Sequence, residues 1–103
     1  MSPITVGQLT NFPDGQGVGV VIAGRRLAIF RLGERLFAID DACPHRGFPL
    51  NDGVVNGLML RCRTHGSCFD LETGAVVRGP AAIGVRTYRV RIDGDSVVVE
   101  GDF

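Results

Sequence analysis

The sequence lacks the features of a membrane-spanning or secreted chain. Its most apolar stretches, 18–23 and 27–32, are far shorter than the roughly 20 apolar residues that a helix needs to cross a bilayer. Residues 1–8 show no charged segment followed by a long apolar core, so we expect no signal peptide. These absences predict a cytoplasmic protein with no membrane partner.

An excess of charge of one sign is also missing. Among the 103 residues, 11 basic side chains balance 11 acidic ones, and the formal net charge at pH 7 is zero. A protein that binds nucleic acid by its overall charge needs a basic excess. We therefore expect no nucleic-acid partner, and any protein partner must recognise a local patch.

The sequence has few cysteines, and their number is odd. Three cysteines cannot complete a disulfide framework, and the cytosol keeps thiols reduced. A domain of this size buries only about 60 to 68% of the surface that its unfolded chain exposes, so its core is thin. The combination favours a bound metal as additional stabilisation.

Helical periodicity is absent as well. No segment of about a dozen residues keeps apolar positions at helical spacing without a glycine or proline, whereas short runs of Val, Ile, Leu and Phe recur between turn signals. The sequence therefore predicts an all-β fold. The expected strands are a meander over 18–22, 27–32 and 35–39, and a hairpin over 85–92 and 96–100 that turns at Asp93-Gly94.

The residues that carry chemistry lie between positions 41 and 82. A Cys43-x-His45 motif is followed by a Cys62-x-x-His65 motif, and the two motifs use both histidines of the chain. Each short loop thus offers one thiol and one imidazole. A hairpin that turns at Asn56-Gly57 would bring the two loops together, so the four side chains are candidate metal ligands.

Two metals compete for this set of ligands. Structural zinc accepts two Cys and two His, but its familiar spacings place both Cys in one loop and both His in another. Mixed loops suit a binuclear 2Fe-2S cluster, in which two thiolates bind one iron and two imidazoles bind the other, as in Rieske centres. The spacing favours iron. Zinc, in a binding module without redox activity, is the alternative.

These motifs resemble those of the Rieske family, and the chain is similar in length to the soluble Rieske ferredoxins. The resemblance extends to segments 47–50, 69–74 and 79–81. It implies a single Rieske 2Fe-2S domain over residues 1–103. The implied fold is an antiparallel β-sandwich base with a small two-loop cluster-binding subdomain at about 41–82.

The resemblance also implies a role for each ligand. Cys43 and Cys62 would bind the inner iron, and His45 and His65 would bind the outer, more exposed iron. Segment 79–81 would cover the cluster as a third loop.

The function implied is that of a soluble one-electron carrier and not of an enzyme. Such a ferredoxin passes electrons from a ferredoxin reductase to a terminal oxygenase of the aromatic-ring-hydroxylating type, through transient contacts with both. The alternative is a small Rieske-like subunit of an NAD(P)H-dependent nitrite reductase, which would be held in a stable complex. Arg46, Arg61 and Arg63 near the loops form either a solvated face or a surface that guides docking to an acidic partner.

The chain departs from the high-potential respiratory members of the family at three positions. Those members carry an additional Cys in each ligand loop, joined in a disulfide, where this chain has Phe48 and Thr64. They also place a Ser and a Tyr hydroxyl near the cluster sulfurs, and this chain keeps Ser67 but has Phe69 at the second position. Hydrogen bonds to sulfur favour the reduced, more negative cluster, so the loss of one lowers the potential.

We therefore predict a reduction potential in the lower part of the Rieske range of about −150 to +300 mV. A redox titration followed by visible absorption measures it. A midpoint well above 0 mV would contradict the reasoning from the missing hydroxyl and disulfide.

Overall fold

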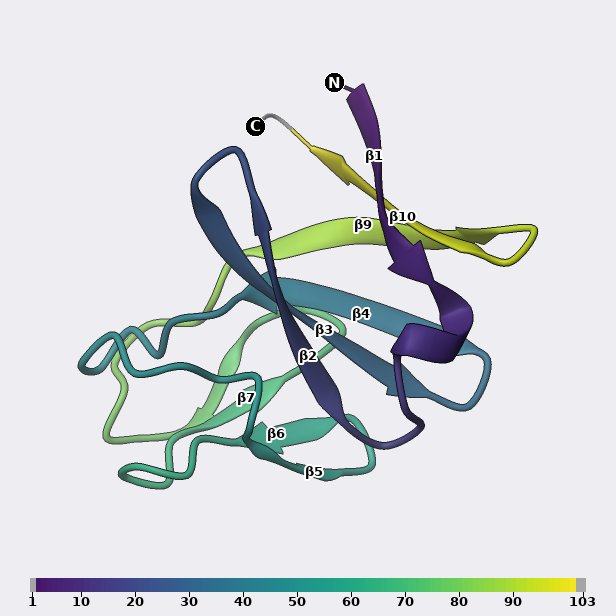
Figure 1. The fold of residues 1–103 in the computed structure, drawn as a ribbon. Helices are drawn as coiled ribbons and strands as arrows, with labels where there is room; N and C mark the ends of the chain where they lie inside the picture. The colour runs from purple at the N-terminus through teal and green to yellow at the C-terminus, as the bar shows by residue number, and fades with distance from the viewer. Residues whose placement is uncertain (1, 102–103) are drawn as a thin grey trace.

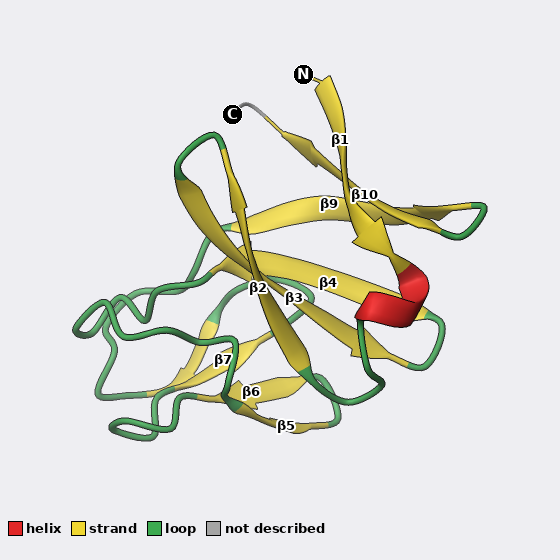
Figure 2. Ribbon diagram, viewed as in Figure 1, coloured by secondary structure: helices red, strands yellow, loops and turns green. Residues whose placement is uncertain are grey.

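The structure is a computed structural model that describes residues 2–101. It consists of antiparallel strands and one short 3-10 turn, η1 (Leu9–Asn11), as Figures 1 and 2 show. Within these residues no helix is long and apolar enough to span a membrane. The strands are β1 (Ser2–Gln8), β2 (Gly17–Ile22), β3 (Arg25–Leu32), β4 (Arg35–Asp40), β5 (Val54–Asn56), β6 (Met59–Arg61), β7 (Cys68–Asp70), β8 (Val76–Arg78), β9 (Thr87–Asp93) and β10 (Ser96–Gly101). The all-β prediction is confirmed.

The strands form two sheets. One has six strands in the order β1-β10-β9-β4-β3-β2, and the other has four in the order β5-β6-β7-β8. Strands β4 and β9 pair only at Ala38–Tyr88 and Ile39–Thr87, so the six-stranded sheet divides there into two halves. The halves pack on each other through a shared apolar core and form the sandwich base. The predicted meander (β2 to β4) and the β9–β10 pairing are both present.

Strand β3 is buried on both faces because two cores meet at it. Leu27 and Ile29 point into the core of the sandwich base, whereas Ala28 and Phe30 point into a second core. That second core lies between the base and the four-stranded sheet. A strand covered on both faces has a nearly continuous apolar sequence, which is what residues 27–30 show.

The positions of two predicted turns were wrong by one residue. The predicted central residues were Asn56-Gly57 and Asp93-Gly94. In the structure they are Gly57-Leu58 in the β5–β6 hairpin and Gly94-Asp95 in the β9–β10 hairpin. Each glycine is the first central residue and has a φ near +62° or +63°. A two-residue hairpin loop with glycine at its first central position needs that positive φ, so glycine sets the position of the turn.

Strand β1 was not predicted from the sequence, and β9 starts two residues later than predicted. Strand β1 pairs with β10 at the edge of the sheet, where its Pro3 is tolerated. Strand β9 begins at Thr87 and not at residue 85, because the Val85 N–H donates to the Gly74 carbonyl oxygen at 2.8 Å. This bond holds the segment before β9 against the turn between β7 and β8.

Gly74 offers a test of that close backbone approach. Gly74 and Gly94 both have a positive φ, but a Cβ on Gly74 would lie 2.1 Å from the Val85 oxygen, whereas a Cβ on Gly94 meets nothing within 4 Å. We expect Gly94→Ala to cost about 1 to 2 kcal/mol for the backbone conformation alone. Gly74→Ala should cost about 1 to 3 kcal/mol more, because the neighbouring backbone must move. Urea denaturation of both variants compares them, and equal losses would contradict the close approach.

Candidate metal centre

The first ligand loop is closed by two backbone hydrogen bonds. The Cys43 N–H donates to the Phe48 oxygen at 2.7 Å, and the Gly47 N–H donates to the Cys43 oxygen at 2.6 Å. Gly47 has a φ of +77°, which lets the chain reverse within the loop.

The second ligand loop is closed in the same way. The Cys62 N–H donates to the Ser67 oxygen at 2.8 Å, the Gly66 N–H donates to the Cys62 oxygen at 3.1 Å, and Gly66 has a φ of +79°. Each loop thus has a cysteine, a glycine four residues after it, and, five residues after it, the carbonyl oxygen that accepts from the cysteine N–H. The two loops differ in the histidine, which is two residues after Cys43 and three after Cys62.

The structure brings the four predicted ligands together as two pairs. The Cys43 and Cys62 side chains are buried, at 3% and 2% exposure, and belong to the second core. The His45 and His65 rings lie edge to face with their centroids 4.9 Å apart. His45 is half-buried and His65 is exposed. The site thus runs from buried sulfur to exposed imidazole.

The surroundings of the Cys43 thiol raise its pKa. Burial raises the pKa of Cys43, and the neighbouring Cys62 raises it further, whereas hydrogen bonds from the His45 backbone and the Ser67 side chain lower it. Two thiolates held this close in an apolar core repel each other. A bound cation removes that cost, so the paired thiols suit a metal centre.

The donor set fits a binuclear cluster. Among residues 2–101, no three His, Cys, Asp or Glu side chains gather where they could hold one metal ion. A Rieske cluster is compatible with this arrangement, because each of its irons takes only two protein ligands. Thiols and imidazoles are also the donor types that this cluster uses.

Asp41 anchors the first loop to the end of β4, and the sequence analysis did not identify it. Its carboxylate is 3% exposed and accepts hydrogen bonds from the Leu50 N–H at 2.7 Å, the Asn51 N–H at 2.8 Å and the Asn51 side chain at 2.6 Å. A buried carboxylate is costly unless it is hydrogen-bonded in this way. Asp41 and Asn51 therefore join the two ends of the loop that carries Cys43 and His45.

Ser67 connects the second loop to segment 79–81. Its hydroxyl is completely buried and accepts a hydrogen bond from the Ala81 N–H at 3.0 Å. The same side chain interacts with the Cys43 thiol. Segment 79–81 is thus attached to the second ligand loop through Ser67, and its predicted role as a cover of the cluster stays a prediction.

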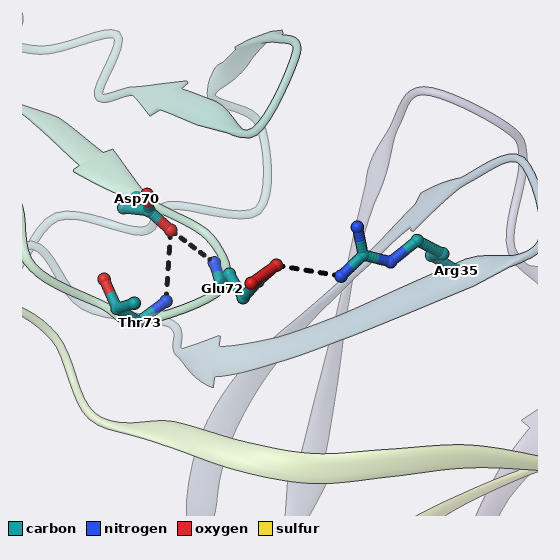
Figure 3. Close-up of polar contacts among 4 residues, drawn as sticks. All are labelled: Arg35, Asp70, Glu72 and Thr73. Atoms are coloured by element: carbon teal, nitrogen blue, oxygen red, sulfur yellow. Dashed lines mark hydrogen bonds and ion pairs between the residues drawn. The ribbon is translucent and has the colours of Figure 1, made fainter.

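The turn after β7 fixes the far end of the four-stranded sheet, as Figure 3 shows. Asp70 Oδ1 accepts hydrogen bonds from the backbone N–H groups of Glu72 at 2.8 Å and Thr73 at 3.1 Å. Glu72 forms an ion pair with Arg35 of β4 at 2.9 Å. Both side chains of this pair are exposed, so the ion pair adds little stability and the Asp70 turn sets the local geometry.

Comparisons with known proteins agree with this geometry. The family model described as the Rieske [2Fe-2S] domain matches residues 2–89. The ferredoxin component of the naphthalene 1,2-dioxygenase system of Pseudomonas aeruginosa is 30% identical over 92 residues, which cover 89% of this chain and 88% of that protein.

Solved structures give the same result. The ferredoxin of carbazole 1,9a-dioxygenase from Nocardioides aromaticivorans IC177 has a TM-score of 0.93 and 29% identity, with 99% of this chain and 100% of that chain covered. A complex of reduced oxygenase and oxidised ferredoxin in carbazole 1,9a-dioxygenase has a TM-score of 0.89 and 26% identity, with 97% and 94% covered. A protein from Mycobacterium tuberculosis, described as a candidate NADH-dependent nitrite reductase small subunit, has a TM-score of 0.86 but only 23% identity, with 95% and 93% covered. That last likeness shows the fold alone.

The Asp41 carboxylate can be tested against a neighbouring one. Both carboxylate oxygens of Asp41 accept hydrogen bonds from N–H groups. In Asp41→Asn an NH2 group replaces one of these oxygens and faces a donor, whichever way the amide is turned. We therefore expect a loss of about 1.5 to 3 kcal/mol in the free energy of unfolding. Asp52→Asn changes an exposed carboxylate next to the same loop and should stay within about 0.5 kcal/mol of the parent. Urea denaturation of the two variants measures the difference. Equal stabilities would show that Asp41 does not hold the loop.

Proposed function

The chain belongs to the Rieske [2Fe-2S] family, and from this premise we propose that it is the ferredoxin of an aromatic-ring-hydroxylating dioxygenase system. The observation that supports this most strongly is the arrangement of two buried thiols behind two imidazoles, one of them exposed. Its relatives in the naphthalene and carbazole systems are electron-transfer components and not catalysts. A carrier of this kind is not itself an enzyme.

We propose that Cys43 and Cys62 hold one iron and that His45 and His65 hold the other. When bound, a 2Fe-2S cluster of this type supplies a centre that accepts and releases one electron at a time. The protein buries the sulfur side in the second core, and Ser67 donates to the Cys43 sulfur. The exposed His65 then provides the edge at which a partner comes within reach of the cluster.

The proposed partners are a terminal oxygenase and a ferredoxin reductase. A ferredoxin with 26% identity has been solved in complex with its oxygenase in the carbazole system, which supports the first partner. The reductase follows from the need to reload a one-electron carrier after each transfer. We place the protein in the cytoplasm, where its three thiols stay reduced. We further propose that residues 1–103 are one Rieske domain with a cluster-binding subdomain at about 41–82.

The nitrite reductase alternative makes a different prediction for the purified protein. A small subunit of that enzyme would stay bound to a large flavin- and haem-containing partner through gel filtration. A dioxygenase ferredoxin forms a small, transient interface, so it should elute alone. Co-elution with such a partner from the native source would overturn the proposed function.

Cysteine substitutions test the proposed ligands. We expect Cys62→Ala to lose the brown colour, the visible absorption and both iron and inorganic sulfide, while circular dichroism still reports β-structure. Cys68→Ala is the matched control because Cys68 is also a buried thiol, at 4% exposure, but lies outside the ligand pairs. It should keep two irons and two sulfides per chain. If Cys68→Ala loses the cluster and Cys62→Ala keeps it, the assigned ligands are wrong.

A further inference from the structure

The charges of this neutral chain are unevenly distributed. Within residues 2–101, the ion pairs join Arg35 to Glu72 and Arg91 to Asp93 and Glu100, all outside the ligand loops. The region of the ligand loops, residues 41–82, holds four arginines and four carboxylates. Three of these carboxylates already have partners: Asp41 is buried and accepts hydrogen bonds within the first loop, Asp70 accepts hydrogen bonds in the turn after β7, and Glu72 pairs with Arg35. In the part of the chain that the structure describes, the four arginines have no such carboxylate partner, so positive charge predominates among the charges that stay unpaired there.

Four arginines on the ligand loops and on the strands next to them are all exposed. We call them the basic collar: Arg46, Arg61, Arg63 and Arg78. Within residues 2–101 none of them forms an ion pair with a carboxylate. Their charges are therefore available to a partner.

Two members of the basic collar lie in the ligand loops themselves, and the other two lie on adjoining strands. Arg46 follows His45 directly in the first loop, and Arg63 reaches from the second loop to the Asp52 backbone oxygen. Arg61 and Arg78 are both paired with Cys68, so their side chains lie on the same face of the sheet. On that face the Arg61 guanidinium lies beside Gly66 of the second ligand loop. The loops extend to the side of the molecule opposite the β9–β10 turn, as Figure 1 shows.

Apolar side chains of the ligand loops and of the segment after β8 are also exposed. Phe48 is 44% exposed although its ring centroid lies 6.3 Å from that of His65. Ile83, two residues after the buried Ala81, is 66% exposed. Exposed apolar groups rimmed by charge are typical of a surface that binds another protein.

We propose that the basic collar is the docking surface for an acidic face on the electron-transfer partners of this chain. The inference rests on the proposed function and adds the charge of the partner to it. A carrier with one exposed cluster edge must receive and deliver its electron through that edge. The reductase and the oxygenase therefore both present acidic docking faces, and they occupy the basic collar in turn.

Electrostatic steering gives this surface a measurable consequence. Complementary charge raises association rates by about 10- to 1,000-fold at low ionic strength and has less effect on final affinity. The Debye length falls from about 30 Å at 0.01 M salt to about 3 Å at 1 M. A docking surface made of four exposed arginines should thus act strongly at low salt and weakly at high salt.

An electrode with a defined surface replaces the unidentified partners in the test. The holoprotein diffuses from solution to gold coated with carboxylate-terminated or ammonium-terminated alkanethiols, and the electron-transfer rate is measured by voltammetry. We expect transfer on the carboxylate film to be at least about tenfold faster than on the ammonium film at 0.01 M salt. The difference should vanish near 1 M salt. Equal rates on the two films at low salt would overturn the proposal, because a neutral chain has no overall charge that could mask a local patch.

Matched variants locate the effect on the basic collar. We expect Arg46→Gln to slow transfer on the carboxylate film about two- to fivefold, since one of four charges is lost. Arg46→Lys keeps the charge and should restore the rate, and Arg89→Gln removes an exposed arginine on β9, outside the basic collar, and should have no effect. Equal slowing by Arg46→Gln and Arg89→Gln would contradict the assigned surface.

The readouts separate this inference from the proposed function. Visible absorption and the midpoint potential report the cluster in every variant before the electrode measurement. If the cluster is absent from the parent protein, the proposed function fails. If the cluster is present and redox-active but shows no preference for the carboxylate film, only the acidic-partner inference fails.

Discussion

The constraint on which the site depends is that two thiols must be held side by side inside an apolar core. Such a pair is unfavourable without a cation, because burial and the neighbouring Cys62 both raise the pKa of Cys43 and so favour its protonated form. The chain holds the pair by giving each cysteine the same rigid turn, closed by two backbone hydrogen bonds around a glycine with positive φ. This shared turn fixes Cys43 and Cys62, and the different histidine spacing then lets the two imidazoles meet at 4.9 Å.

The cysteine pair and the fold are stabilised by the same packing. Cys43 and Cys62 belong to the second core, together with Phe30 and Ile39 of the sandwich base and Phe69 of the four-stranded sheet. A change in how the sheet packs on β3 and β4 therefore moves the sulfur side of the site. The imidazole side has no such support and lies toward solvent. This arrangement suits a protein that exchanges electrons with partners, because it shields the sulfurs from water and leaves the other side of the site accessible.

The sequence allowed much of this to be predicted, and the rest depended on contacts that leave no local pattern. The strands β2, β3, β4, β9 and β10 were evident because their apolar runs are bounded by turn residues. The pairing of the two ligand loops followed from the hairpin between them. Asp41 was missed because a carboxylate after a strand is usually a solvated turn residue, and only its bonds to residues 50 and 51 show its role. The three-residue strands β7 and β8 were missed because so few residues cannot establish an alternation.

The loops lack a covalent link, so the way in which they are joined matters for stability. Respiratory members of the family tie the two loops with a disulfide at the positions that Phe48 and Thr64 occupy in this chain. Here Phe48 of the first loop lies 6.3 Å from the ring of His65 in the second, and the Ser67 hydroxyl holds the backbone of Ala81 against the second loop. These are a partly exposed ring contact and a single hydrogen bond, and such contacts contribute less than a disulfide that removes the entropy of a long loop. A metal centre bound by both loops, as we propose, would supply the cross-link that the cysteines do not, and its binding would then be part of the folding free energy of this end of the molecule.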